Sequence, residues 1–498
     1  MSVLSKSKTT VGVYSLPARA ASALATSSFT HLSSTGLRTS FAARIRNVRI
    51  APVYVESGAM RALLLLLLLA LPAAAQGLDG KTVKKMEAFG ARWWKARPQT
   101  KFHKWSSKER AALTREAKAF GAIPEGSFEA VRAALWKSIK KYGPKGKGGA
   151  KLYIEPKGYK LKMWAGVSGR GKNQGLIMSL HGGGKGAGSS DGSWQWKGCI
   201  TIAPQGLLLH GDNWNRVHGE KQILTYIEIA KAQWNVDPDR VYCCGFSMGG
   251  TGSWHMAGRF PDLLAGAAPC AGVLMAQPKS QLKSKEEIQT IQYGLVPNVR
   301  NLAMYYFIGL EDVNCMPGTY LYVADMLEEL KKEDPTGYTK IRFKTYPGLA
   351  HAYPPGEPGN AFKYLSQQRR DSYPEKIVWQ YALQPHPLAD GDDGTGRYIQ
   401  RWFYNLYHAN PRDKMEVIVE RKGNEFDVEA IGGENENLYL MLNPKMIDVK
   451  QDVIVRVDGE EIYRGKPQPD FWTVVQSLDS RLDRTLTFDR RVALWKDE

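Results

Sequence analysis

The residues best suited to chemistry lie in the segment VYCCGFSMGG, residues 241–250, where one serine is flanked by glycines. Ser247 has Gly245 two positions before it and Gly249 two positions after it. The apolar residues before Gly245 predict a buried strand, and a helix is expected from about Thr251. Small residues are needed beside so sharp a strand-to-helix turn, because larger side chains would collide with neighbouring elements. The pattern predicts that Ser247 is a nucleophile at the positive end of a helix.

A second glycine-rich turn, HGGG at residues 181–184, directly follows the apolar run at residues 176–180. Glycines there let backbone N–H groups point at a reacting group without obstruction by side chains. We expect the N–H groups of Gly183, Gly184 and Met248 to bind the oxyanion of a tetrahedral intermediate. A phosphate-binding loop is the alternative, but the Lys-Ser or Lys-Thr pair of such loops does not follow.

These segments resemble the bacterial esterase and depolymerase branch of the α/β-hydrolase superfamily, which includes polyhydroxybutyrate depolymerases and feruloyl esterases. The resemblance covers residues 150–375, and the DPDR segment at residues 237–240 is particularly characteristic. The other matching segments are LHGGG at 180–184, APQG at 203–206, GLED at 309–312 and YPGLAH at 346–351. The resemblance implies an α/β-hydrolase fold and an ester hydrolase that needs no cofactor.

The resemblance also implies the partners of Ser247, namely an acid in a Gly-x-x-Asp turn and then a histidine. Asp312 ends such a turn, and His351 lies in the turn after the next expected strand. His351 would accept the serine proton and return it to the leaving group, while Asp312 would orient the imidazole. Glu311 is the alternate acid.

Several aromatic and polar residues are candidates for the substrate pocket. His181, Trp214 and Glu311 either line it or have structural roles in its loops. Trp194 and Trp196 either offer aromatic surfaces to a sugar or phenolic acyl group, or pack in the core.

The elements that must position these residues begin near residue 150, where short apolar runs alternate with helical stretches. This alternation is typical of a doubly wound, mostly parallel sheet. Strands are expected at residues 175–180, 199–203, 241–245, 264–268, 302–308 and 341–346, and helices at 217–234 and 320–332. The segment 278–299 is expected to be either a helical cap over the site or a crossover helix.

Changes in composition divide the chain into six parts. They are a leader or a stretch before the true start at 1–59, a signal peptide at 60–75, a basic helical segment with a Gly-rich linker at 76–149, an α/β-hydrolase domain at 150–378, a connecting segment at 379–414, and a small β-sandwich-like domain at 415–498. Strands of this all-β domain are expected at 415–419, 426–431, 438–442, 453–457, 486–488 and 492–494.

The formal net charge of +19 comes entirely from residues 1–150, so residues 151–498, which include the expected hydrolase domain, sum to zero. The basic helices are expected to be water-facing surfaces rather than a nucleic-acid site. From Met60 onward, an arginine, a leucine run and small residues before Gln76 form an export signal. We expect a secreted or periplasmic protein with no membrane span after cleavage. An uncleaved anchor, or an organellar transit peptide at residues 1–59, is the alternative.

The sequence gives no sign of a metal site, because HExxH motifs and paired Cys-x-x-Cys spacings are absent. Its five cysteines are too few for a disulfide scaffold, although one bridge between Cys270 and Cys315 would suit an oxidising compartment.

Together the motifs predict an exported serine carboxylesterase that acts through an acyl-enzyme on a plant-derived, cell-wall-derived or polyester substrate. A serine peptidase of the prolyl-oligopeptidase type is the first alternative, and a non-catalytic protein that binds a surface polymer is the second. The motifs indicate neither the individual ester nor the oligomeric state.

Overall fold

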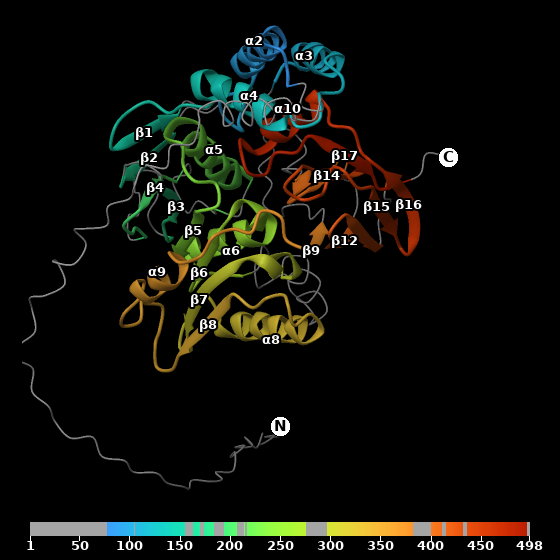
Figure 1. The fold of residues 1–498 in the computed structure, drawn as a ribbon. Coiled ribbons are helices and arrows are strands. Elements are labelled where there is room, and N and C mark those ends of the chain that lie inside the picture. The colour runs from blue at the N-terminus through green and yellow to red at the C-terminus, as the bar shows by residue number, and fades with distance from the viewer. Residues whose placement is uncertain are drawn as a thin grey trace, which may run out of the picture. The chain divides into compact units, whose positions relative to one another are not determined.

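The fold is that of a computed structural model, which describes residues 77–103, 105–154, 163–169, 174–183, 194–206, 214, 217–274, 296–381, 400–410, 415–431 and 436–495 (Figure 1). The predicted leader and signal peptide lie outside the described residues, as do Gly184 and most of the predicted cap segment.

An eight-stranded sheet, here called the hydrolase sheet, has the strand order β1-β2-β4-β3-β5-β6-β7-β8. Its strands are β1 (Lys151–Ile154), β2 (Met163–Ser168), β3 (Gly175–Leu180), β4 (Cys199–Pro204), β5 (Val241–Phe246), β6 (Gly266–Cys270), β7 (Ala303–Gly309) and β8 (Ile341–Tyr346). The strands from β4 to β8 are parallel, whereas β1 and β2 run antiparallel to their neighbours. All residues of β3, β4, β6 and β7 are buried, as their unbroken apolar sequences indicate. The predicted α/β-hydrolase fold is confirmed.

Helices connect these strands and position the loops at their ends. They are α5 (Val217–Trp234), α6 (Met248–Arg259), α8 (Pro317–Glu333) and α9 (Gly359–Leu365), with 3₁₀ turns at Pro261–Leu263 and Pro297–Asn301. Helix α5 has the predicted limits, whereas α8 begins earlier, at Pro317, because the fixed φ of proline suits a first helical turn. Strand β6 starts at Gly266 rather than Leu264, because the chain is still leaving the 3₁₀ turn there.

Two further sheets occupy the C-terminal region and share one apolar core. One has the order β16-β15-β13-β12-β9, and the other has the order β10-β11-β14-β17. Their strands are β9 (Lys376–Tyr381), β10 (Trp402–Phe403), β11 (Leu406–His408), β12 (Met415–Lys422), β13 (Glu425–Ile431), β14 (Leu438–Leu442), β15 (Val453–Val457), β16 (Glu460–Gly465) and β17 (Arg490–Ala493).

The limits of this region differ from the sequence-based ones at two places. Strands β9, β10 and β11 involve the expected connecting segment, so the sheets begin before residue 415. The strand expected at 486–488 is a turn, because Asp483 Oδ1 accepts hydrogen bonds from the N–H groups of Thr485 and Leu486. Leu486 and Phe488 are nevertheless buried, which accounts for the apolar pattern.

The N-terminal helices pack against a helix from the far end of the chain. Helices α2 (Gly80–Ala96), α3 (Ser107–Ala119) and α4 (Phe128–Tyr142) share a core with α10 (Phe471–Arg481) (Figure 1). The rings of Phe89 and Phe471 lie 5.3 Å apart in that core. The sequence patterns did not predict α10. The expected linker at 144–149 is also held in place, since the Gly146 N–H donates to Gln233 Oε1 at 3.0 Å.

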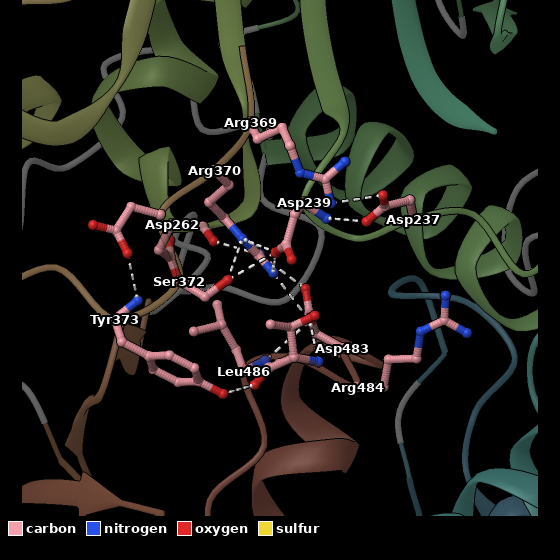
Figure 2. Close-up of polar contacts among 12 residues, drawn as sticks. Asp237, Asp239, Asp262, Arg369, Arg370, Ser372, Tyr373, Asp483, Arg484 and Leu486 are labelled. Carbon is pink, nitrogen blue, oxygen red and sulfur yellow. Dashed lines mark hydrogen bonds and ion pairs between the residues drawn. The ribbon is translucent and has the colours of Figure 1, made fainter. Parts of the chain in front are cut away.

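Buried ion pairs join the hydrolase sheet to the C-terminal region (Figure 2). Arg370 lies 2.7 Å from Asp239 and 2.9 Å from Asp483, and Figure 2 shows its guanidinium between the two carboxylates. Lys231 of α5 adds a second cation 2.7 Å from Asp483. Because a buried charge is costly unless it is paired, these contacts hold the two regions in one relative position.

Two further findings concern membrane spans and cysteines. Among the described residues, no helix is both long and apolar enough to cross a membrane. All five cysteines are described, and all are buried and free, so the predicted bridge between Cys270 and Cys315 is absent.

Candidate active site

Ser247 lies between β5 and α6 in a strained backbone conformation, with φ 60° and ψ −125°. Residues other than glycine rarely adopt a positive φ, and such strain is concentrated at functional sites. Its N–H donates to the Cys270 carbonyl oxygen at 3.0 Å, which ties the turn to β6. The hydroxyl is thus presented at the carboxyl edge of the hydrolase sheet and at the N-terminus of α6.

The glycines around Ser247 are required by close backbone approach. A Cβ on Gly249 would lie 2.0 Å from the Leu180 carbonyl oxygen, and one on Gly245 would lie 2.4 Å from the backbone of Gly249. The predicted steric reason for the GxSxG pattern therefore holds at both positions.

His351 joins Ser247 to Asp312 through one chain of hydrogen bonds. Its Nε2 lies 2.8 Å from Ser247 Oγ, and its Nδ1 lies 2.7 Å from Asp312 Oδ2. Since an ionised carboxylate only accepts, Nδ1 carries the proton and Nε2 is free to accept one from the serine. The three side chains come from the ends of β5, β7 and β8, where parallel strands bring their following loops together.

Asp312, and not Glu311, is the carboxylate that contacts His351. The Asp312 side chain is buried, and its Oδ1 accepts hydrogen bonds from the N–H groups of Asn314 and Cys315 at 2.9 and 3.0 Å. Glu311 is exposed, and only its backbone contributes, through an N–H that donates to the Leu349 carbonyl oxygen at 3.0 Å. That bond fixes the acid turn to the loop of His351.

The predicted oxyanion loop lies beside the serine. A Cβ on Gly182 would be 3.5 Å from Ser247 Cβ, so the backbone of the HGGG turn runs directly past the nucleophile. Gly183 follows at this edge and Met248 begins α6, whereas Gly184 lies outside the described residues. The structure describes two of the three predicted donors, the N–H groups of Gly183 and Met248. Both thus lie on segments that flank Ser247.

The candidate pocket residues His181 and Trp214 are fully buried. The indole Nε1 of Trp214 donates to the His181 carbonyl oxygen at 3.0 Å, and the two rings lie 4.8 Å apart. These contacts hold the predicted oxyanion loop in place. Trp194 is also fully buried and packs on Phe362, which favours the core interpretation of that residue.

Two aromatic residues of the site were missed by the sequence patterns. The ring of Phe246 lies 4.9 Å from the His351 imidazole and stacks on Tyr353 at 4.3 Å. Phe246 thus contacts the imidazole, and Tyr353 packs on Phe246. The available signal was position, since Phe246 directly precedes the serine and Tyr353 closely follows the histidine.

Cysteines near the serine are poor nucleophiles. Burial raises the pKa of Cys243 to about 12, and it raises the pKa of Cys244 well above the usual thiol range. The thiolate is the reactive form of cysteine. Cys315 lies near the histidine, and one ligand atom from each of Asp312, Cys315 and His351 falls within 4.8 Å of the others. In this structure the carboxylate and imidazole of that group are already hydrogen-bonded to each other.

Comparisons with known proteins find hydrolases. Residues 208–379 match the dienelactone hydrolase family. A stretch of 109 residues is 29% identical to the bifunctional acetylxylan esterase/xylanase XynS20E of Neocallimastix patriciarum, and it covers 20% of this chain and 16% of that protein. The family match and this relative support an ester hydrolase.

Similar solved structures include two esterases. A thermostable esterase has 17% sequence identity and a TM-score of 0.35, with 44% of this chain and 62% of that chain covered. An acetyl xylan esterase from Aspergillus awamori has 14% identity and a TM-score of 0.33, with 44% and 99% covered.

Proposed function

We propose that this chain is an exported serine carboxylesterase with Ser247 as nucleophile, His351 as base and Asp312 as the orienting acid. The observation that carries the proposal is the hydrogen-bond chain from Ser247 Oγ through His351 to Asp312, at 2.8 and 2.7 Å. The strained turn under Ser247 and the glycine loop beside it support the same assignment.

The reaction would follow the usual acyl-enzyme route. His351 Nε2 accepts the serine proton as Ser247 Oγ attacks the carbonyl carbon of the ester. The carbonyl oxygen becomes an oxyanion, which accepts hydrogen bonds from the N–H groups of Gly183, Gly184 and Met248. The intermediate then collapses, and His351 gives the proton to the departing alcohol. Water activated by the same imidazole then releases the acid.

The substrate proposed first is an acetyl ester on a xylan-type polysaccharide. The support is the 29% identity to a relative named as an acetylxylan esterase/xylanase. Other cell-wall esters and polyesters fit the same chemistry, so a panel of such esters measured side by side is the means to rank them.

Export is the second part of the proposal, and it rests on the arginine, leucine run and small residues of segment 60–75. N-terminal sequencing of the protein recovered outside the cytoplasm is expected to give Gln76 as the first residue. A full-length chain that stays inside the cell would contradict export while leaving the esterase proposal open.

A fluorophosphonate probe tests the nucleophile. The wild type is expected to be labelled, and Ser247→Ala is expected to lose both labelling and hydrolysis of p-nitrophenyl acetate by at least about 10⁴-fold. Ser366→Ala is a matched control, because this serine is exposed at the C-cap of α9. Labelling that persists in Ser247→Ala would contradict the assignment of Ser247 as the nucleophile. Faster cleavage of prolyl anilides than of acetate esters would instead identify a peptidase.

A further inference from the structure

A cavity of about 310 Å³ lies where the N-terminal helices meet the C-terminal region. Its walls come from the segment after α2, from the start of α3, from α10, and from β10 and β11. None of the proposed catalytic residues lines it. Ligand sites are common at such junctions between structural units.

The cations deep in this cavity are neutralised. Arg97 Nε lies 2.8 Å from Asp479, and its Nη2 lies 3.1 Å from Glu228. Lys101 Nζ lies 2.5 Å from the same Glu228 carboxylate. These two cations and two carboxylates balance, so they add no net charge to the cavity.

Two further cations in the lining are not balanced. Arg110 and Arg401 are both exposed, and neither guanidinium has an acidic partner among the residues that the structure describes. Two guanidinium groups facing one cavity repel each other, and a bound anion would relieve that repulsion. The planar, forked guanidinium is particularly suited to carboxylate and sulfate groups.

Aromatic rings form another part of the wall. Trp402 and Tyr407 contact each other with ring centroids 4.6 Å apart, and the Arg110 guanidinium lies 5.7 Å from the ring of Trp105. Two buried wall atoms, Trp105 Nε1 and Gln476 Oε1, have no hydrogen-bond partner within the described part of the chain. Buried polar atoms usually have hydrogen-bond partners. A ligand bound in the cavity would supply the partners that these two atoms lack.

We propose that this cavity binds an acidic sugar unit, a pyranose ring that carries a carboxylate or a sulfate. The anionic group would lie between Arg110 and Arg401, and the ring would pack against Trp402 and Tyr407. The choice of a sugar over another aromatic-stacking anion, such as a nucleotide, rests on the proposed function. The anion site itself rests on the charges alone. Its role would be to hold the enzyme on an acidic polysaccharide while Ser247 acts on esters of the same polymer.

Binding of monosaccharides to the full chain tests the site independently of catalysis, and Ser247→Ala protein serves equally well. Sodium glucuronate, glucose 6-sulfate, glucose and AMP are titrated and followed by ligand-observed NMR. At least one acidic sugar is expected to bind at least about tenfold more tightly than glucose. A preference for glucuronate identifies a carboxylated sugar, and a preference for glucose 6-sulfate identifies a sulfated one.

Arg110→Ala and Arg401→Ala are each expected to weaken binding of the preferred acidic sugar about tenfold, because each removes one forked contact. Arg115→Ala is the matched control, since this arginine is exposed on the same helix as Arg110 but does not line the cavity. It is expected to bind like the wild type. Equal binding of glucose and both acidic sugars, or acidic-sugar binding that survives both arginine substitutions, would overturn the proposal. Tighter binding of AMP than of either acidic sugar would replace it with a nucleotide site.

Discussion

Two neighbouring acids share the turn after β7, and their side chains point in different directions. Asp312 is 1% exposed and contacts His351, whereas Glu311 is exposed and does not. The Gly-x-x-Asp spacing favoured Asp312 and left Glu311 as the alternate. Only the hydrogen bonds from the N–H groups of Asn314 and Cys315 show which carboxylate is turned inward.

Asp312→Asn is therefore expected to lower kcat about 10⁴-fold with little change in KM. An amide at this position would favour the wrong tautomer of His351. Hydrolysis of p-nitrophenyl acetate measures the effect. Glu311→Gln, one position away, is the matched control and should keep the wild-type kcat. If the two substitutions had the reverse effects, Glu311 would be the acid.

Thiol reactivity is a second property of single residues. Burial raises the pKa of Cys199 to about 11 and that of Cys243 to about 12, and all five cysteines are buried. Since the thiolate is the reactive form, a thiol reagent such as DTNB is expected to label the folded protein very slowly. After denaturation it should label all five. Rapid labelling of the folded chain, with loss of esterase activity, would mean that a thiol near the site is accessible.

At the scale of elements, strands β3 to β8 were predicted, most of them as short apolar runs next to a glycine or turn signal, whereas β1 and β2 were not. Helix α10 was not, although Asp470 is an N-cap and Phe471, Val474 and Leu478 have helical spacing. The helix interrupts a series of strands, and its apolar face packs on the N-terminal helices, whose partner the sequence could not indicate. Local patterns thus identified elements, while the pairing of distant elements depended on contacts that only folding creates.

The turn between β5 and α6 makes a sharp prediction for one glycine. In Gly249→Ala the new methyl group would lie 2.0 Å from the Leu180 carbonyl oxygen, so strand β3 and helix α6 must separate. We expect a loss of about 3 kcal/mol in the free energy of unfolding and a loss of activity. Urea denaturation measures the free energy of unfolding, and ester hydrolysis measures the activity. Gly318→Ala is the control, because a Cβ there meets nothing within 4 Å. Equal unfolding midpoints for both variants would contradict the steric argument.

For the whole molecule, the decisive contacts join residues far apart in sequence. Arg370 and Asp483 are 113 positions apart, and Lys231 and Asp483 are 252 apart. No sequence pattern indicates that these residues pair. In the sequence alone, each resembles an ordinary surface charge. Their burial makes the C-terminal region part of the structural support of the hydrolase sheet rather than an appended module.

Asp483→Asn tests that support through its dependence on pH. Burial alone would raise the pKa of Asp483, but the charges of Arg370 and Lys231 hold it well below the usual range. A carboxylate whose pKa is lowered on folding contributes stability that is present above its unfolded pKa of about 3.9 and lost as pH falls further. At neutral pH the substitution removes the carboxylate that pairs with Lys231 and leaves Arg370 with Asp239 as its acidic partner, so we expect a loss of about 3–5 kcal/mol.

The difference in unfolding free energy between wild type and Asp483→Asn should therefore be constant from neutral pH down to about pH 5. It should shrink below about pH 4, because Asp483 in the unfolded wild-type chain then takes up a proton while the folded carboxylate, with its lowered pKa, stays ionised. Chemical denaturation at a series of pH values measures this difference. Asp325→Asn, an exposed position on α8, should give a difference near zero throughout. If the difference in unfolding free energy for Asp483→Asn were small at neutral pH, or grew in acid, the buried pairs would not hold the two regions together.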